Sequence, residues 1–219
     1  MKTLECAVSS RGAFLIYNYR YIMNILFPIA SYLIGAIPFG LILGKLAGID
    51  VRTAGSGNIG ATNVSRLLGK KLGSATLVLD CLKGFLPIFA ASHLLPDGSG
   101  KQVVMLLCGI MAVVGHMFPV YLGFRGGKGV ATGLGVFLFL SPPAIAISLV
   151  VFVGLVALTG FVSVGSLAAA GLFPLWLFIL GQPLAYVYAG MVIGGLIWVK
   201  HHQNIIRLFR GVEMSWKKK

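Results

Sequence analysis

Long runs of apolar residues, separated by short polar segments, recur along almost the whole of this 219-residue chain. An α-helix needs about 20 apolar residues to cross a bilayer, and it satisfies every backbone hydrogen bond internally, as a lipid environment requires. The pattern therefore predicts an all-α polytopic membrane protein with about seven transmembrane helices. The expected spans are residues 24–43, 72–95, 103–121, 133–140 with the preceding 129–132, 144–159, 164–180 and 184–199.

Two of these spans are irregular. The fourth is closed by Ser141-Pro142-Pro143, and such a helix covers roughly 18 Å of a hydrocarbon core that is ~30 Å thick. It is therefore either a short helix sheltered by its neighbours or a re-entrant segment that lines a cavity. Within the first span, Pro38 predicts a kink.

Composition supports the membrane class and excludes several functions. A soluble domain carries about 25% charged residues, whereas only 11% of this chain is charged and its mean hydropathy is +0.94. The net charge of +13 is spread over short loops, which fits membrane topology and anionic ligands better than nucleic acid. Because only five residues are acidic, we expect neither a carboxylate-held metal site nor a hydrolase with paired carboxylates. We also expect no cofactor.

The chain divides into three segments. Residues 1–22 are interrupted by charges and lack the apolar centre of a signal peptide, so we expect an N-terminal extension that precedes a natural start at Met23. Residues 23–213 form the predicted seven-helix membrane domain, and residues 214–219 form a basic C-terminal tail.

The positions of Lys and Arg predict the orientation, because loops rich in these residues stay in the cytoplasm. The loops on one side hold most of them, whereas the other side holds only Lys101 and the basic residues of the extension. We therefore expect the mature N-terminus outside and the C-terminus in the cytoplasm.

Three polar clusters would then share the cytoplasmic face. The first, residues 55–66, reads Gly-Ser-Gly-Asn-Ile-Gly-Ala-Thr-Asn-Val-Ser-Arg. Glycine lets backbone amides approach a ligand closely, and the hydroxyl, amide and guanidinium groups are suited to phosphate oxygens. The alternative is a flexible loop between two helices.

The second cluster, residues 115–132, contains Gly126-Gly127-Lys128-Gly129. Glycines beside a lysine are expected where backbone amides and an ammonium hold a phosphate together. Gly129 stands where a Walker A loop has Ser or Thr, so ATP hydrolysis is not supported. The alternative is a loop that only sets the topology.

The third cluster begins where the last span ends. If that helix continues, His201, Asn204 and Arg207 recur every three residues on one face and could bind phosphate. A juxtamembrane basic helix on anionic lipid is the alternative. Deeper in the second span, Asp80 and Lys83 are three residues apart, which favours a structural ion pair although Lys83 could also serve the phosphate site.

Some catalytic motifs are absent from the sequence. It contains no Gly-x-Ser-x-Gly elbow, and no histidine is followed five residues later by Asp. A nucleophilic serine or a His/Asp mechanism is therefore disfavoured.

Taken together, the motifs resemble the PlsY-type acyl-phosphate:glycerol-3-phosphate acyltransferases. The similarity covers residues 23–213 and rests on Gly55 to Asn63, Lys83-Gly84, Gly115-His116 with Gly126 to Gly129, and His201-x-x-Asn204-Ile205. The resemblance implies a bacterial cytoplasmic (inner) membrane enzyme whose active site faces the cytoplasm. It would make lysophosphatidic acid from glycerol 3-phosphate and a fatty acyl phosphate, beside a soluble enzyme that supplies the acyl phosphate. Ala36 and His202-Gln203 depart from the usual family residues.

The expected site follows from these motifs. The predicted catalytic residues are Ser56, Arg66, Lys128, His201 and Asn204. The predicted substrate-binding residues are Gly55, Gly57, Asn58, Gly60, Thr62, Asn63, Lys83, His116, Gly126, Gly127, Gly129 and Arg207. Lys128, Arg66, His201 and Asn204 are expected to hold phosphate, and the glycine amides to stabilise the oxyanion. The competing function is a transporter or flippase of a phosphate-bearing small molecule, given the short fourth helix and the intramembrane charges.

Overall fold

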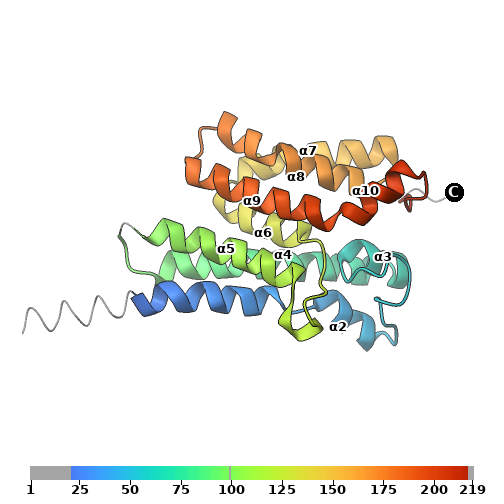
Figure 1. Cartoon of the computed structure of the whole chain (residues 1–219), viewed down its shortest axis with the longest axis horizontal. Helices are drawn as coiled ribbons and strands as arrows, with labels where there is room; N and C mark the ends of the chain where they lie inside the picture. Colours follow the sequence, from blue (N-terminus) through green and yellow to red (C-terminus); the bar gives the residue numbers. More distant parts are fainter. Residues whose placement is uncertain (1–20, 99, 217–219) are drawn as a thin grey trace, which may run out of the picture.

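The computed structural model describes residues 21–98 and 100–216, and every regular element in these ranges is a helix. The expectation of an all-α chain is therefore confirmed for the described residues. Most of the predicted N-terminal extension and the last three residues of the basic tail lie outside them. The long helices lie side by side along the longest axis of the molecule (Figure 1).

The helix bounds follow the apolar runs closely. Residues 21–35 form the first described helix. The others are α2 (Phe39–Leu46), α3 (Ala61–Leu68), α4 (Lys70–Leu94), α5 (Lys101–Met117), the 3₁₀ turn η1 (Val120–Leu122), α6 (Val130–Leu140), α7 (Pro142–Thr159), α8 (Val162–Ile179), α9 (Leu184–Lys200) and α10 (His202–Phe209).

The first span is broken at the expected place. The helix ends at residue 35, and α2 begins directly after Pro38. Proline has no N–H to donate and its ring clashes with the preceding turn. The carbonyl oxygen of Ile37, at this break, accepts hydrogen bonds from the Phe39 amide at 3.1 Å and from Lys83 Nζ at 2.9 Å.

The helix α4 lies at the centre of one group and packs against α3, α5 and α6, while α8 packs between α7 and α9. Small residues allow α4 and α6 to pack closely. A Cβ on Gly84 would collide with the carbonyl oxygen of Thr132, and one on Gly135 with that of Cys81. The N-terminal end of α6 is thereby fixed against α4, beside the loop that carries the second polar cluster.

Among the described residues, five helical segments are long and apolar enough to cross a membrane, and a sixth counts if α9 and α10 form one bent span. The fourth predicted span is the 11-residue α6, roughly 17 Å long at 1.5 Å per residue. The count of seven spans and the orientation of the termini stay predictions.

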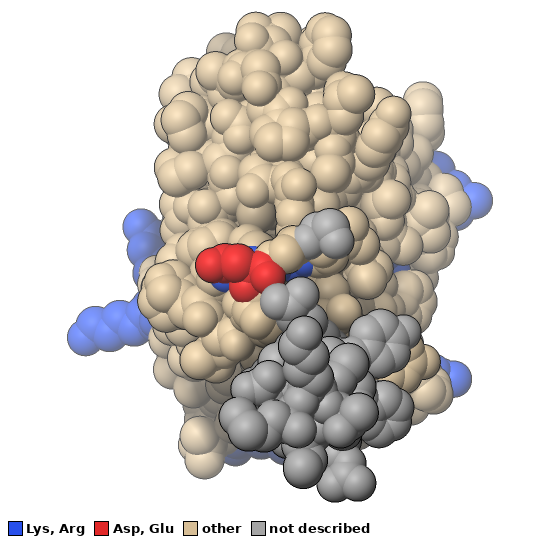
Figure 2. Space-filling model, turned by 90° about the vertical axis from the view of Figure 1, so that its left-hand side faces the viewer, with Lys and Arg blue, Asp and Glu red and all other residues tan. Residues whose placement is uncertain are grey.

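The two ends of the helical bundle differ in polarity. Figure 2 shows the end where α4 and α5 are joined, and most of its described surface is uncharged. The three polar clusters lie at the opposite end, beside α3 and α10 (Figure 1).

Candidate active site

A polar cavity of about 150 Å³ lies where the three clusters meet. Its walls come from the loops before α3 and α6, the first turns of these two helices, the junction of α9 with α10, and the C-terminal segment, together with residues of α4, α5, α7 and α8. Three cations line it, namely Arg66, Lys128 and Arg207. The sequence prediction that the three clusters share one face is thus met by the described structure.

The first loop is shaped by the side chain of Asn63, which is almost fully buried. Its Oδ1 accepts a hydrogen bond from the Ser56 amide at 2.9 Å, and its Nδ2 donates to the Val51 and Ala54 carbonyls at 2.9 and 3.2 Å. A Cβ on Gly55, whose φ is +59°, would collide with Asn63 Oδ1. Asn63 therefore holds the loop so that Ser56 faces the cavity.

Two helix N-termini meet at this cavity. Gly60 and Gly129 are the N-cap residues of α3 and α6, and neither helix has a side-chain cap hydrogen bond within the described residues. Asn58 Oδ1 accepts the Gly60 amide at 2.8 Å, one position before α3 begins. The Asn63 amide donates to the Gly60 carbonyl oxygen at 3.1 Å, so the amides of Ala61 and Thr62 are the first-turn donors that α3 offers to an anion. The first-turn amides of α6 lie at the same cavity.

The second loop packs tightly on the end of α5. The amides of Gly126 and Gly127 donate to the carbonyls of Met117 and His116 at 3.2 and 3.0 Å. A Cβ on Gly127 would collide with Nε2 of the His116 ring. The glycines therefore bring the loop close to α5 and set the position of Lys128.

Lys128 is half-buried beside other cations. Burial lowers the pKa of its ammonium to about 8, and Arg207 and Arg66 add to this effect. Burial also lowers the pKa of Arg66, which keeps its charge at neutral pH. Arg207 is paired with Glu213 at 2.7 Å. The positive charge left to attract an anionic ligand is therefore that of Arg66 and Lys128.

The third cluster does not continue as a straight helix, because α9 and α10 meet at an angle of 55° at His201. His201 and Asn204 are buried, at 3% and 5% exposure. His201 Nδ1 lies 2.8 Å from the Ile197 carbonyl oxygen, which can only accept, so Nδ1 carries the proton. Burial, together with the charge of Lys128, lowers the pKa of His201 to about 4, so the neutral ring offers Nε2 as a hydrogen-bond acceptor.

Glu213 is a site residue that the sequence prediction missed. Its carboxylate accepts hydrogen bonds from Ser163 Oγ, Asn204 Nδ2 and Arg207 Nε, at 2.8, 2.6 and 2.7 Å. Burial raises the pKa of Glu213, but these hydrogen bonds outweigh it and the net shift is downward. The one sequence signal was the scarcity of acids, since Glu213 is the only acidic residue after Asp97.

The C-terminal segment continues across the cavity. Arg66 Nη2 donates to the Met214 carbonyl oxygen at 3.0 Å. The Trp216 amide donates to the Gly160 carbonyl oxygen at 2.6 Å. Met214 lines the polar cavity and Trp216 lines a neighbouring one.

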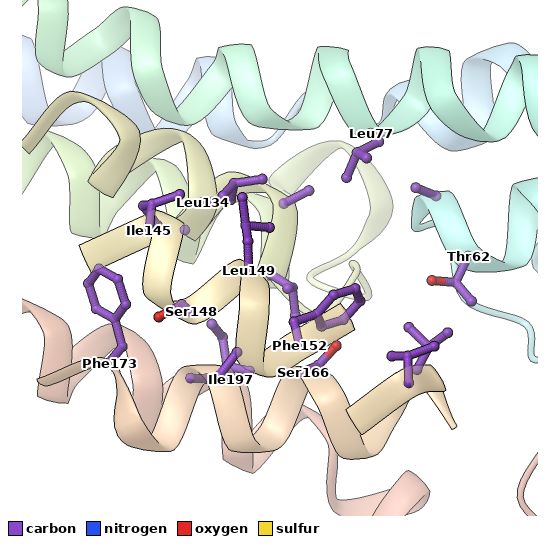
Figure 3. Close-up of a pocket in the computed structure, with 18 of the residues that line it drawn as sticks. Thr62, Leu77, Leu134, Ile145, Ser148, Leu149, Phe152, Ser166, Phe173 and Ile197 are labelled. Carbon is purple, nitrogen blue, oxygen red and sulfur yellow. The ribbon is translucent and has the colours of Figure 1, made fainter. Parts of the chain in front are cut away.

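That neighbouring cavity is apolar and measures about 480 Å³. It lies among α4, α6, α7, α8 and α9, and Figure 3 shows Leu134, Leu149 and Phe173 among its walls, with Thr62 at one end. The two cavities share several wall residues: Ala61, Thr62, Leu77, Val130, Ala131, Phe152, Val162 and Ser166. The site therefore joins a cationic compartment to a longer apolar one.

Asp80, Lys83 and His116 form a buried charged group behind the polar cavity, each at most 4% exposed. Lys83 Nζ lies 2.9 Å from Asp80 Oδ1, and His116 Nδ1 lies 3.7 Å from the same oxygen. Asp80 and His116 line the cavity, whereas Lys83 is turned to Asp80 and Ile37.

Twelve of the predicted site residues line the polar cavity: Ser56, Asn58, Gly60, Thr62, Asn63, Arg66, His116, Lys128, Gly129, His201, Asn204 and Arg207. Five others lie around it without lining it: Gly55, Gly57, Lys83, Gly126 and Gly127. The roles of all of these residues toward substrate stay predictions. Asp80, Ser163, Ser166, Glu213 and Met214 also line the cavity and were not predicted. Among the described residues, no group of three or more His, Cys, Asp or Glu side chains could hold a metal ion.

A family model described as glycerol-3-phosphate acyltransferase matches residues 25–211. The chain belongs to the glycerol-3-phosphate acyltransferase family. A protein of that name from Desulfotalea psychrophila is 64% identical over 197 residues, covering 90% of this chain and all of that protein. Another from Geobacter sulfurreducens is 45% identical, covering 85% of this chain and 94% of the relative.

The fold is also similar to crystal structures of PlsY, described as an integral membrane glycerol 3-phosphate acyltransferase. Its glycerol 3-phosphate form has a TM-score of 0.83 and 42% sequence identity, covering 89% of this chain and 96% of that one. The lysophosphatidic acid form has a TM-score of 0.81 at the same identity, covering 88% and 94%. The chain is therefore an integral, multi-pass membrane protein of this family, as the apolar runs predicted.

Proposed function

We propose that this protein transfers a fatty acyl group from an acyl phosphate to the 1-hydroxyl of glycerol 3-phosphate. The products are lysophosphatidic acid, that is 1-acyl-glycerol 3-phosphate, and inorganic phosphate. The observation that carries the proposal is the continuity of a cation-lined polar cavity with an apolar cavity about three times larger. A phosphorylated headgroup and a fatty acyl chain need these two environments side by side.

Two anionic phosphates must approach each other in this reaction, and the cations offset their repulsion. Arg66 and Lys128 supply positive charge at neutral pH, and the first-turn amides of α3 and α6 supply neutral donors. Arg66 would exchange the Met214 carbonyl for a phosphate oxygen. Glu213 holds Asn204 and Arg207 in place, so that their groups face the cavity at a fixed position.

The acyl carbonyl would lie where the two cavities join, beside Thr62, Val130 and Ala131. The oxygen of the 1-hydroxyl attacks the carbonyl carbon, and the bond between that carbon and the phosphate oxygen breaks. Backbone amides at this junction would stabilise the oxyanion. The hydroxyl proton passes to the departing phosphate, so no enzymic base is needed to accept it.

His201 fits a role that differs from the one expected. Its neutral ring can accept a hydrogen bond at Nε2 but has no proton there to donate to a phosphate. We assign it to orienting the attacking hydroxyl by accepting its hydrogen bond, while the cations hold phosphate. An acyl phosphate already carries a good leaving group, so positioning and charge neutralisation can supply most of the rate.

We place the site on the cytoplasmic side of a bacterial inner membrane, because the basic loops gather at that end. A soluble enzyme that makes acyl phosphate is the expected source of the donor. The acyl chain would enter between helices from the cytoplasmic leaflet into the apolar cavity.

The test uses the purified full-length protein in lipid, with acyl phosphate and glycerol 3-phosphate and without ATP, metal or thioester. We expect equal amounts of lysophosphatidic acid and phosphate to appear. If product formed only when acyl-CoA was supplied, the assignment of acyl phosphate as the donor would be wrong. Uptake of glycerol 3-phosphate into vesicles without any acylated product would favour the transporter instead.

A further inference from the structure

The mechanism above leaves one wall of the polar cavity without a function. This wall consists of Asp80 from α4 and His116 from α5, both almost fully buried and both lining the cavity. Asp80 Oδ1 and His116 Nδ1 have no hydrogen-bond partner within the described residues. Buried polar atoms of this kind are uncommon, because losing water without gaining a partner costs about 1 to 3 kcal/mol each.

The ion pair with Lys83 does not use up the hydrogen-bonding capacity of the Asp80 carboxylate. Lys83 Nζ forms an ion pair with Asp80 Oδ1 at 2.9 Å and also donates to the Ile37 carbonyl oxygen at 2.9 Å, so its donors are shared between the two oxygens. The pair neutralises the carboxylate's charge and fixes its orientation. A carboxylate can accept about four hydrogen bonds, so Asp80 keeps most of its accepting capacity.

The position of Asp80 and His116 in the cavity indicates which group of glycerol 3-phosphate would contact them. Asp80 and His116 line only the polar cavity, next to the junction, because Leu77, one turn before Asp80 on α4, lines both cavities. The junction also includes Thr62, Val130 and Ala131. The 1-hydroxyl must be at that junction to reach the acyl carbonyl, and the phosphate must be at the cations. The 2-hydroxyl, on the carbon between them, is the group left to face the remaining wall.

We propose that Asp80 binds the 2-hydroxyl of glycerol 3-phosphate by accepting its hydrogen bond, with His116 and Lys83 orienting the carboxylate. This inference rests on the proposed function and adds a specificity residue for the acceptor. The chemistry is complementary, since a hydroxyl donates to an acceptor-only carboxylate while an anionic phosphate is directed away from it, to the cations.

A buried carboxylate makes such a site selective. When a substrate lacks the donor, the carboxylate stays buried and unpaired, and the loss exceeds that of one contact. The protein should therefore discriminate against propane-1,3-diol monophosphate, which keeps the phosphate and the attacking hydroxyl but lacks the 2-hydroxyl. Hydrogen bonds to charged groups predict a preference in kcat/KM of roughly 10- to 100-fold for glycerol 3-phosphate.

The experiment measures kcat/KM for both acceptors at a fixed, saturating acyl phosphate. The main variant is the double substitution Asp80→Leu with Lys83→Met, because replacing a buried ion pair by apolar groups of similar shape is often neutral for stability. We expect the preference for glycerol 3-phosphate to fall to near unity. Asp80→Asn keeps an accepting oxygen without the charge, so it should give an intermediate ratio.

The matched control is Thr76→Val, one turn earlier on α4. Thr76 is also fully buried, donates only to the Leu72 carbonyl of its own helix, and lines neither cavity. The ratio of kcat/KM for glycerol 3-phosphate to that for propane-1,3-diol monophosphate in Thr76→Val should equal the wild-type ratio.

Two results would overturn the inference. One is a wild-type preference near unity. The other is an unchanged preference in the Asp80 variants with a parallel loss for both acceptors, because that is the result of a purely structural pair. Failure of the wild type to acylate either acceptor would instead reject the proposed function, so the two failures are distinguishable.

Discussion

The polar and apolar cavities share a wall but are built in different ways. The polar cavity is formed largely by loops and helix ends, and several of its side chains are held by directed hydrogen bonds, such as those of Asn63 and Glu213. The apolar cavity is formed mostly by the faces of long helices, and non-directional packing defines most of its wall. Headgroup binding is therefore fixed by hydrogen-bond geometry, whereas acyl-chain binding is fixed by the available volume.

This difference predicts different responses to substitution. A change in the polar cavity alters charge or position at the reacting atoms, where an error of about 1 Å can cost a hundredfold in rate. A change in the apolar cavity alters buried area in small increments, about 0.8 kcal/mol for each methylene group.

Removal of the Lys128 ammonium should have the largest effect. We expect Lys128→Ala to lower turnover by a hundredfold or more, because one charged contact to the transition state contributes about 2 to 4 kcal/mol. The loss of turnover is measured from initial rates of phosphate release. The control is Arg125→Ala, an exposed cation in the same loop that does not line the cavity and should leave the rate unchanged. Full activity in a folded Lys128→Ala protein would remove Lys128 from the mechanism.

The pH dependence tests the same group without deleting it. Burial lowers the pKa of Lys128 to about 8, so its charge is lost as pH rises through that value. We expect kcat/KM for glycerol 3-phosphate to fall above pH 8, reaching about a tenfold loss one unit higher.

The Lys128→Arg protein separates this cause from others. Because guanidinium stays protonated, the decline should move to higher pH even if overall activity is reduced. An identical decline in both proteins would assign the titration to another group.

The sequence predicted the polar cavity better than its detailed contacts. The cluster of residues 55–66 and the loop around Lys128 could be recognised because glycines, hydroxyls and cations are conspicuous between apolar spans. The topology then placed them at one end, and the described structure brings them together. The all-α class followed equally directly from the length of the apolar runs.

The details that could not be predicted depend on tertiary geometry. Glu213 reaches Asn204 and Arg207 because the chain reverses at Gly211, where φ is +69°. The bend at His201 and the donation from Lys83 to the break at Ile37 likewise depend on neighbouring helices. The apolar cavity had almost no sequence signal, because its wall residues are the same types that face lipid.

The smallest predicted effect lies in the apolar cavity and takes the form of a shift in selectivity. Gly133 lines only this cavity, and a Cβ there would be 3.2 Å from Ile193 Cγ2 and 3.7 Å from Ile197 Cδ1, which a small side-chain adjustment can accommodate. In Gly133→Leu the added side chain occupies volume that the acyl chain would fill. We expect kcat/KM for the longest acyl phosphates to fall about fourfold for each excluded methylene, while short chains and the KM for glycerol 3-phosphate stay unchanged.

The control for this shift is Gly154→Leu. It adds the same side chain to α7 at a position with no atom within 4 Å of the new Cβ and outside both cavities. Its chain-length profile should match the wild type, since both substitutions replace a helical glycine by a good helix former. If Gly133→Leu instead lowered the rate equally for every chain length, acyl-chain binding would not be set by the volume of the apolar cavity. The proposed difference between the two cavities would then be wrong.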